Sequence, residues 1–165
     1  MRRALIVDDE AGMRHSLQRL LQPAGYEVCT AVSGSEALAM VGKGSFDVAV
    51  LDVQMPGLSG LDTFRRIREI DPKLPVVFIA AYGTAETAIQ AMQMGAYDYL
   101  LKPYDVAALK EVIDRAAEVG RLSRTRVTIE TPPVVDPSED RIVGFNPGMQ
   151  EVFKRIWQVA AANVP

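Results

Sequence analysis

The sequence is poor in the residues that mark several classes of protein. It contains a single cysteine, Cys29, and a single histidine, His15. One thiol excludes an internal disulfide and a cysteine-rich metal site, which favours a reducing compartment. The apolar stretch before Asp8 is too short for a signal peptide, and no later run has the length of a membrane span. We therefore expect a cytoplasmic protein that does not enter a membrane.

An excess of charge of one sign is also missing. The formal net charge is -3 and the isoelectric point is about 5.2, so the chain has no global basic field to attract nucleic-acid phosphates. With 48% hydrophobic and 24% charged residues, the composition is that of a globular domain and not of a disordered chain. We interpret His15 as an ordinary helix residue and Cys29 as a small hydrophobic residue of a strand.

What the sequence does contain is a regular alternation of short apolar runs and helical segments. The runs 4–7, 26–30, 46–51, 76–80 and 97–101 read as strands. Helices are predicted over 11–22, from 33 or 35 to 41, from after Gly57 and Gly60 to before Asp71, from a cap at Thr84 to Gly95, and from a cap at Asp105 onward. The last of these has Val106, Leu109, Ile113 and Ala116 on one face. The runs lack polar alternation, which indicates strands buried on both faces. Five such repeats predict a doubly wound parallel α/β sheet.

The character of the sequence changes near residue 120. Arginines, Thr131-Pro132-Pro133 and Asp136-Pro137 follow, so we expect residues 1–120 to form the domain and 121–140 a linker. Residues 141–165 contain one amphipathic helical stretch without a core to join. We interpret the chain as a fragment of a longer protein.

Acidic residues and one lysine follow three of the predicted strands. Asp8, Asp9 and Glu10 follow the first strand, Asp52 the third and Lys102 the fifth. In an open parallel sheet, ligands bind at this edge. Carboxylates brought together there would repel one another unless a cation intervened, and Mg²⁺ prefers such oxygen ligands. The pattern predicts phosphoryl transfer, with Asp52 as the nucleophile and Lys102 neutralising charge.

These residues give the sequence a resemblance to the receiver domain of two-component response regulators, over residues 1–120. The matching motifs are Val7–Glu10, Leu51–Gly57 with Gly60, Gly95–Leu100 and Leu101–Pro103. The resemblance implies a flavodoxin-like or CheY-like five-stranded sheet with strand order 2-1-3-4-5.

The resemblance also implies roles for individual residues. Asp52 would accept a phosphoryl group from a histidine kinase, while Asp9, Asp52 and the backbone carbonyl of Gln54 ligate Mg²⁺. Asp8 would act through metal-bound water, and Lys102 would pair with the phosphoryl oxygens after a cis peptide bond to Pro103. The domain would catalyse its own phosphorylation and dephosphorylation and would not be a conventional enzyme.

Ala80 departs from the family pattern. The fourth strand of receivers usually ends in Thr or Ser, whose hydroxyl binds the phosphoryl group and whose movement lets an aromatic residue, here Tyr99, turn inward. Loss of a hydrogen bond to a charged group, about 1.5 to 3 kcal/mol, predicts weaker or differently routed switching. Gln54 and Tyr82 resemble the variable positions that tune the lifetime of the aspartyl phosphate.

The tail, from Ile142 to Ala161, resembles the opening of the AAA+ domain in sigma-54-dependent activators of the NtrC type. Such a parent would bind ATP, sigma-54 RNA polymerase and DNA through regions that this chain lacks, so the chain should not hydrolyse ATP. An additional apolar stripe on the fifth helix, Val112, Val119 and Leu122, suggests a homodimer formed by this helix and the linker. The alternative is that the stripe covers more of the helix's own sheet.

Three other functions are compatible with parts of the pattern. A metal-dependent phosphatase with an aspartate nucleophile would need that residue after the first strand and a second Asp two positions on, whereas Asp8 and Asp9 are adjacent. A nucleotide or flavin module would need Gly, Ser or Thr in the first loop, which is acidic here. A receiver that acts by contact without phosphorylation stays open because of Ala80.

Overall fold

The computed structural model describes residues 1–125; the rest of the expected linker and the expected AAA+ segment lie outside the described residues. Within these residues the five predicted strands and the five predicted helices are confirmed, with small shifts at the ends, while the helical stretch expected in 141–165 lies outside them. The elements are β1 (Arg2–Val7), α1 (Ala11–Leu21), the short 3-10 helix η1 (Gln22–Ala24), β2 (Tyr26–Ala31), α2 (Gly34–Lys43), β3 (Val48–Asp52), α3 (Gly60–Ile70), β4 (Val76–Ala80), α4 (Ala85–Gln93), β5 (Asp98–Leu101) and α5 (Val106–Arg124).

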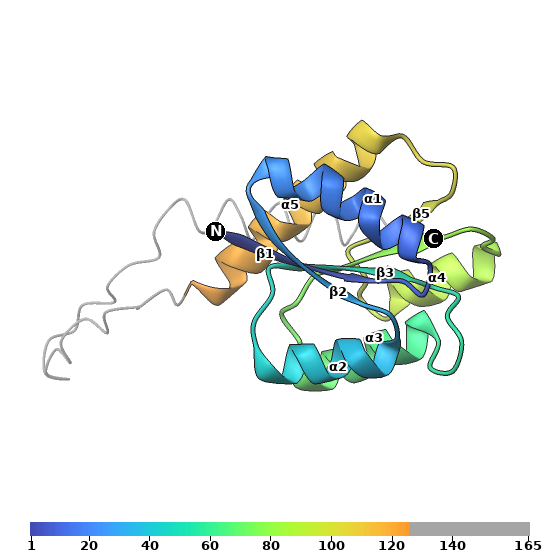
Figure 1. The fold of residues 1–165 in the computed structure, drawn as a ribbon. Helices are drawn as coiled ribbons and strands as arrows, with labels where there is room; N and C mark the ends of the chain where they lie inside the picture. Colours follow the sequence, from blue (N-terminus) through green and yellow to red (C-terminus); the bar gives the residue numbers. More distant parts are fainter. Residues whose placement is uncertain (126–165) are drawn as a thin grey trace, which may run out of the picture. The chain divides into compact units, whose positions relative to one another are not determined.

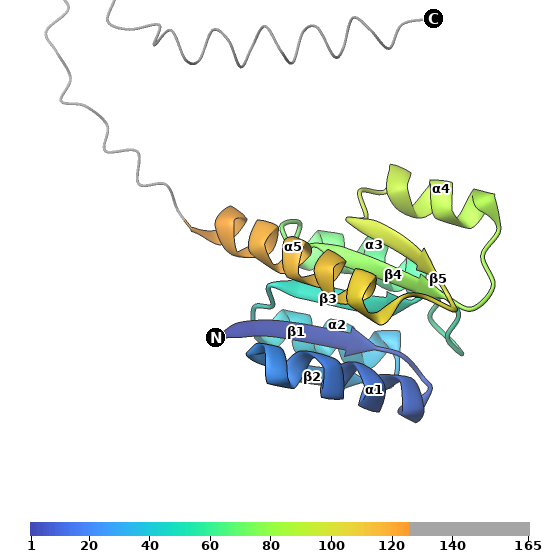
Figure 2. The same ribbon diagram turned by 90° about the horizontal axis from the view of Figure 1, so that it is seen from above.

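The five strands form one parallel sheet in the order β2-β1-β3-β4-β5, as predicted. Helices α1 and α5 cover one face, and α2, α3 and α4 cover the other (Figure 1). Every residue of β3 and β4 is buried, which explains why their sequences are apolar apart from Asp52 at the end of β3. In Figure 2, α4 lies beside β5, one of the two edge strands. This layering leaves the carboxyl ends of the central strands open for a site.

Short polar side chains fix where most helices begin. The side chains of Ser33, Ser59, Thr84 and Asp105 each accept a hydrogen bond from the backbone amide three residues on, so the predicted caps at Thr84 and Asp105 are confirmed. Helix α1 differs, because no side chain caps its amino end.

Helix α5 packs against the sheet more tightly toward its carboxyl end than at its start. Leu109, Ile113 and Ala116, which were predicted to share one face with Val106, are buried, whereas Val106 itself is 55% exposed. Val106 is the first residue of the helix, which has not yet reached the sheet. A Cβ atom at Gly120 would lie 2.1 Å from the carbonyl oxygen of Asp47. The backbones of α5 and the β3 entrance are therefore in direct contact.

An ion pair joins the last turn of α5 to the loop between α3 and β4. Arg124 Nη2 lies 2.6 Å from Asp71 Oδ2, in the loop between α3 and β4. The helix includes residues 121–124, which were predicted to belong to the linker.

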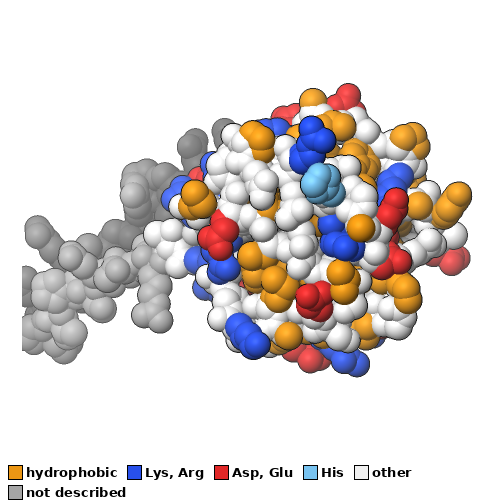
Figure 3. Space-filling view, viewed as in Figure 1, with side chains coloured by type: hydrophobic (Ala, Val, Ile, Leu, Met, Phe, Trp, Pro, Cys, Tyr) orange, Lys and Arg blue, Asp and Glu red, His pale blue; other side chains and the backbone are white. Residues whose placement is uncertain are grey.

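The surface is mixed in charge. On the face drawn in Figure 3, acidic and basic side chains are interspersed with apolar ones. Among residues 1–125, no helix combines the length and the apolar character that crossing a bilayer requires.

Candidate functional site

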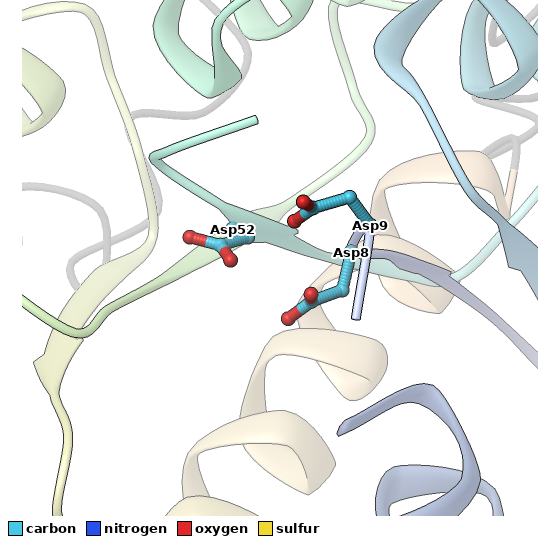
Figure 4. Close-up of side chains that lie close together, drawn as sticks. All are labelled: Asp8, Asp9 and Asp52. Atoms are coloured by element: carbon cyan, nitrogen blue, oxygen red, sulfur yellow. The ribbon is translucent and has the colours of Figure 1, made fainter. Parts of the chain in front are cut away.

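Three carboxylates meet where the two central strands end. Asp8 and Asp9 directly follow β1, and Asp52 is the last residue of β3, not the first after it as the sequence suggested. Because β1 and β3 are neighbours, one carboxylate oxygen from each residue lies within 4.8 Å of the others (Figure 4). Asp8 and Asp52 are buried, whereas Asp9 is exposed to solvent. The cluster offers only hard oxygen donors.

Asp8 is the most deeply placed member of the cluster, at 2% exposure. Its Oδ1 accepts a hydrogen bond of 2.8 Å from the amide of Glu10. Burial raises the pKa of the Asp8 carboxyl to about 6, and the nearby charges of Asp52 and Asp9 act in the same direction. The site thus carries more negative charge than its own groups neutralise.

Lys102 is the cation that reaches this cluster. Its Nζ lies 3.9 Å from Asp8 Oδ2 and 3.9 Å from Asp52 Oδ2. The lysine follows β5, its amide donates to the carbonyl of Ala80, and its peptide bond to Pro103 is cis, as the resemblance implied. The ammonium group is therefore within reach of any anion placed on Asp52.

The loop after β3 is held close to Asp52 by a glycine. The amide of Gln54 donates to Asp52 Oδ1 over 3.0 Å, and the amide of Gly60 donates to the carbonyl of Val53. A Cβ atom at position 60 would lie 2.1 Å from the Asp52 carbonyl oxygen and 2.8 Å from the Val53 Cα. Only glycine fits there without moving the backbone that carries Asp52.

Gln54 and Tyr82 face each other across the mouth of the site. Both line an open pocket of about 420 Å³ beside Lys102. Gln54 Nε2 donates a long hydrogen bond of 3.5 Å to the Tyr82 carbonyl, and the Tyr82 residue is 81% exposed. The contact joins the loop after β3 to the loop after β4.

Ala80 and Tyr99 lie on the face of the sheet covered by α4. Ala80 is fully buried in that core, and the ring of Tyr99 packs against the same core beside Phe78. The Tyr99 hydroxyl is buried without a hydrogen-bond partner. A Cβ atom at Gly83 would lie 2.5 Å from this hydroxyl oxygen. The ring thus occupies an inward position that Gly83 leaves open.

The raised pKa of Asp8 predicts how stability varies with pH in the metal-free protein. Between the ordinary pKa of 3.8 and about 6, the folded chain holds a proton on Asp8 that the unfolded chain has released. Stability therefore falls as pH rises through this window, by up to about 3 kcal/mol from this group. We expect Asp8→Asn to remove that part of the fall, as measured by urea unfolding from pH 4 to 7.5. Equal slopes for wild type and variant would contradict the assignment.

Two residues near the site were not predicted from the sequence. Arg14 on α1 donates from Nη1 to the Asp8 carbonyl over 2.8 Å, and Gly83 makes room for the Tyr99 hydroxyl. A basic residue five positions after the acidic pair was the only signal for Arg14. Nothing in the local sequence indicated Gly83, because its neighbour comes from another strand.

Comparison with known proteins places this arrangement in a family. The sequence profile described as "Response regulator receiver domain" matches residues 4–114. The transcriptional regulatory protein ZraR of Salmonella typhimurium is 35% identical over 159 residues, which cover 96% of this chain and 35% of ZraR. The DNA-binding transcriptional regulator NtrC of Klebsiella pneumoniae is 34% identical over 161 residues, covering 98% of this chain and 34% of NtrC. The chain thus spans about a third of the length of these relatives.

A solved structure agrees with the fold. The response regulator TrrA of Thermotoga maritima, in complex with Mg²⁺ and BeF, has a TM-score of 0.64 and 34% identity, covering 70% of this chain and 99% of that one. The homology to sigma-54 activators of the ZraR and NtrC type extends over nearly the whole sequence. With its strand order, its acidic cluster and these matches, the chain belongs to the response-regulator receiver family.

Proposed function

We propose that this receiver accepts a phosphoryl group on Asp52 from the phosphohistidine of a histidine kinase, in a reaction that requires Mg²⁺. The observation that carries the proposal is the position of Asp52, with its carboxylate next to those of Asp8 and Asp9 and 3.9 Å from the Lys102 ammonium. A nucleophile, a cation and an excess of oxygen ligands are therefore combined at one point of the surface.

The residues present fit a hard divalent cation. All side-chain donors of the cluster are carboxylate oxygens, and the raised pKa of Asp8 reflects burial together with nearby negative charge that a cation would offset. Asp9, Asp52 and the Gln54 carbonyl would hold Mg²⁺, with Asp8 interacting through water. When bound, the ion supplies positive charge opposite the carboxylates and the phosphoryl oxygens.

The chemistry at Asp52 is a substitution at phosphorus. One carboxylate oxygen of Asp52 attacks in line, so that an O–P bond forms while the P–N bond to the kinase histidine breaks and the imidazole leaves with the electron pair. Lys102 pairs with the phosphoryl oxygens as their charge spreads. Hydrolysis later returns the Asp52 carboxylate and releases inorganic phosphate.

The test is phosphorylation by a small donor. Incubation with acetyl phosphate and Mg²⁺ should add one phosphoryl group, with acetate as the leaving group. An absence of mass gain would favour the alternative, a receiver regulated by contact alone, for which Ala80 is the motivating observation. A phosphatase acting on outside substrates is disfavoured, because its nucleophile would follow β1 and not β3.

Readout of the phosphoryl group is proposed to involve Ala80 and Tyr99, with the Ala81 amide binding the group in place of a side-chain hydroxyl. We expect Ala80→Thr to strengthen the coupling, because a hydroxyl bonded to a charged group is worth about 1.5 to 3 kcal/mol, roughly tenfold or more in an equilibrium. The measurement is the monomer–dimer equilibrium with and without beryllofluoride, by sedimentation.

The matched control for this prediction is Ala80→Val, which has the shape of threonine without its hydroxyl. A beryllofluoride response that is larger in Ala80→Thr than in Ala80→Val supports the proposed readout. A response in Ala80→Thr that is unchanged or smaller than in wild type would refute it.

Gln54 and Tyr82 are proposed to tune the lifetime of the phosphorylated state. Their hydrogen bond lies at the pocket beside Lys102, and the proposal is that water reaches Asp52 past these two residues. A wider or narrower opening at these two residues would change the rate of hydrolysis.

The longer protein to which this receiver corresponds is proposed to be a cytoplasmic sigma-54-dependent transcriptional activator. Phosphorylation would control its oligomerisation through α5 and the linker, where Val119 and Leu122 are exposed on the described part of the helix. ATP, sigma-54 RNA polymerase and DNA would bind through regions beyond this chain.

A further inference from the structure

Arg14 occupies a position on α1 where a cation is electrostatically unfavourable. It lies at the end of the first turn, close to the partial positive charge of the helix amino end. No acidic residue lies in that turn, and no side chain caps the helix. Helix formation therefore gives no reason for an arginine here.

The Arg14 side chain instead reaches back over the turn between β1 and α1. Its Nη1 donates a partly buried hydrogen bond of 2.8 Å to the carbonyl oxygen of Asp8. A guanidinium is well suited to this span, because it is long, planar and always charged. The contact joins the start of the helix to the residue from which the acidic cluster begins.

With this contact, Asp8 is fixed at three of its four polar atoms. Its amide donates to Ala31 on β2, its carbonyl accepts from Arg14, and its Oδ1 accepts from the amide of Glu10. The remaining oxygen, Oδ2, faces Lys102 at 3.9 Å. The turn that carries Asp9 is therefore fixed at the preceding residue, Asp8, through both backbone and side-chain atoms.

We infer that Arg14 is a positioning residue for the Mg²⁺ site, acting through the backbone of Asp8 and touching neither the ion nor the phosphoryl group. The inference rests on the proposed function, because it assigns Arg14 a role in presenting Asp8 and Asp9 to the same ion. Its loss frees the turn and spreads the two carboxylates over more orientations.

The direction of the change in Mg²⁺ affinity on replacing Arg14 distinguishes a positioning role from a purely electrostatic one. Removing a cation that is bonded to the Asp8 carbonyl strengthens Mg²⁺ binding if charge alone matters. Removing a residue that orients the ligands weakens it, and outer partners of metal ligands commonly contribute on the order of tenfold or more in affinity. We expect Arg14→Ala to bind Mg²⁺ about tenfold more weakly and Arg14→Lys to recover part of the loss.

The experiment is calorimetric titration of the metal-free 165-residue chain with MgCl₂ at constant ionic strength. Arg19→Ala is the matched control, since it removes an exposed arginine from the last turn of the same helix and should leave the affinity unchanged. Thermal unfolding of each variant checks that the fold persists. If Arg14→Ala does not fold, the Mg²⁺ affinity of Arg14→Lys is decisive, because lysine keeps the charge but lacks the planar guanidinium. Weaker binding than in wild type then supports the positioning role, and equal or tighter binding overturns it.

The possible outcomes distinguish this inference from the proposed function. Mg²⁺ affinity in Arg14→Ala that equals or exceeds that of wild type overturns the positioning role, while phosphorylation of the wild type leaves the proposed function standing. If the wild-type chain binds no Mg²⁺ and gains no phosphoryl group, the proposed function fails and this inference fails with it.

Discussion

Asp52→Asn is expected to abolish phosphoryl uptake from acetyl phosphate. The amide has nearly the same shape as the carboxylate, so the fold should persist, but it offers no anionic oxygen to attack phosphorus. Asp52 is buried beside Lys102 at the end of β3. Asp8 and Asp9 follow a different strand, β1, so neither takes the place of Asp52. Intact-mass measurement of wild type and variant, with acetyl phosphate and MgCl₂, gives the result directly.

Asp105→Asn is the matched control for this experiment, because it makes the same chemical change at a helix cap where asparagine is as good as aspartate. It should take up the phosphoryl group as wild type does. A persistent mass gain in Asp52→Asn would show that another residue is the acceptor.

Gly60→Ala should be the most disruptive single-methyl change at the site. The added Cβ would meet the Asp52 carbonyl oxygen at 2.1 Å and the Val53 Cα at 2.8 Å, and both are backbone atoms that cannot rotate away. Overpacking of this kind costs about 1 to 3 kcal/mol. We expect a loss of unfolding free energy of that size in urea titration, together with slower phosphorylation, because the strand end that carries Asp52 is displaced.

Gly42→Ala provides the contrast. Gly42 lies in α2 and a Cβ atom there meets nothing within 4 Å, so alanine should be neutral or stabilising by up to about 1 kcal/mol. If Gly60→Ala were as stable and as reactive as Gly42→Ala, the close contact between residue 60 and the backbone of Asp52 and Val53 would not matter for stability or phosphorylation.

The fold could be predicted from the sequence because its signals are local. The fully buried strands β3 and β4 have no polar alternation, and Thr84 and Asp105 cap their helices through atoms only three residues away. The exposure of Val106 could not be predicted in the same way. Its place depends on how far the start of α5 stands from the sheet, which no helical periodicity encodes.

Some residues of the site could also be predicted from the sequence, and others could not. Asp8, Asp9, Asp52 and Lys102 could be identified because strand ends in a parallel sheet meet at one edge. Arg14 and Gly83 were missed, since each matters through one contact with a residue on a different element. Such contacts depend on side-chain direction in three dimensions.

The unpartnered hydroxyl of Tyr99 has an energetic consequence of its own. Removing a phenolic oxygen from water without replacing its hydrogen bond costs about 1 to 3 kcal/mol, which the ring must recover by packing beside Phe78. Packing and apolar burial of the Tyr99 ring stabilise its inward orientation, and the loss of hydration at the hydroxyl opposes it. A phenylalanine at this position would keep the packing and avoid this cost, so the hydroxyl of Tyr99 contributes nothing to the stability of the inward orientation.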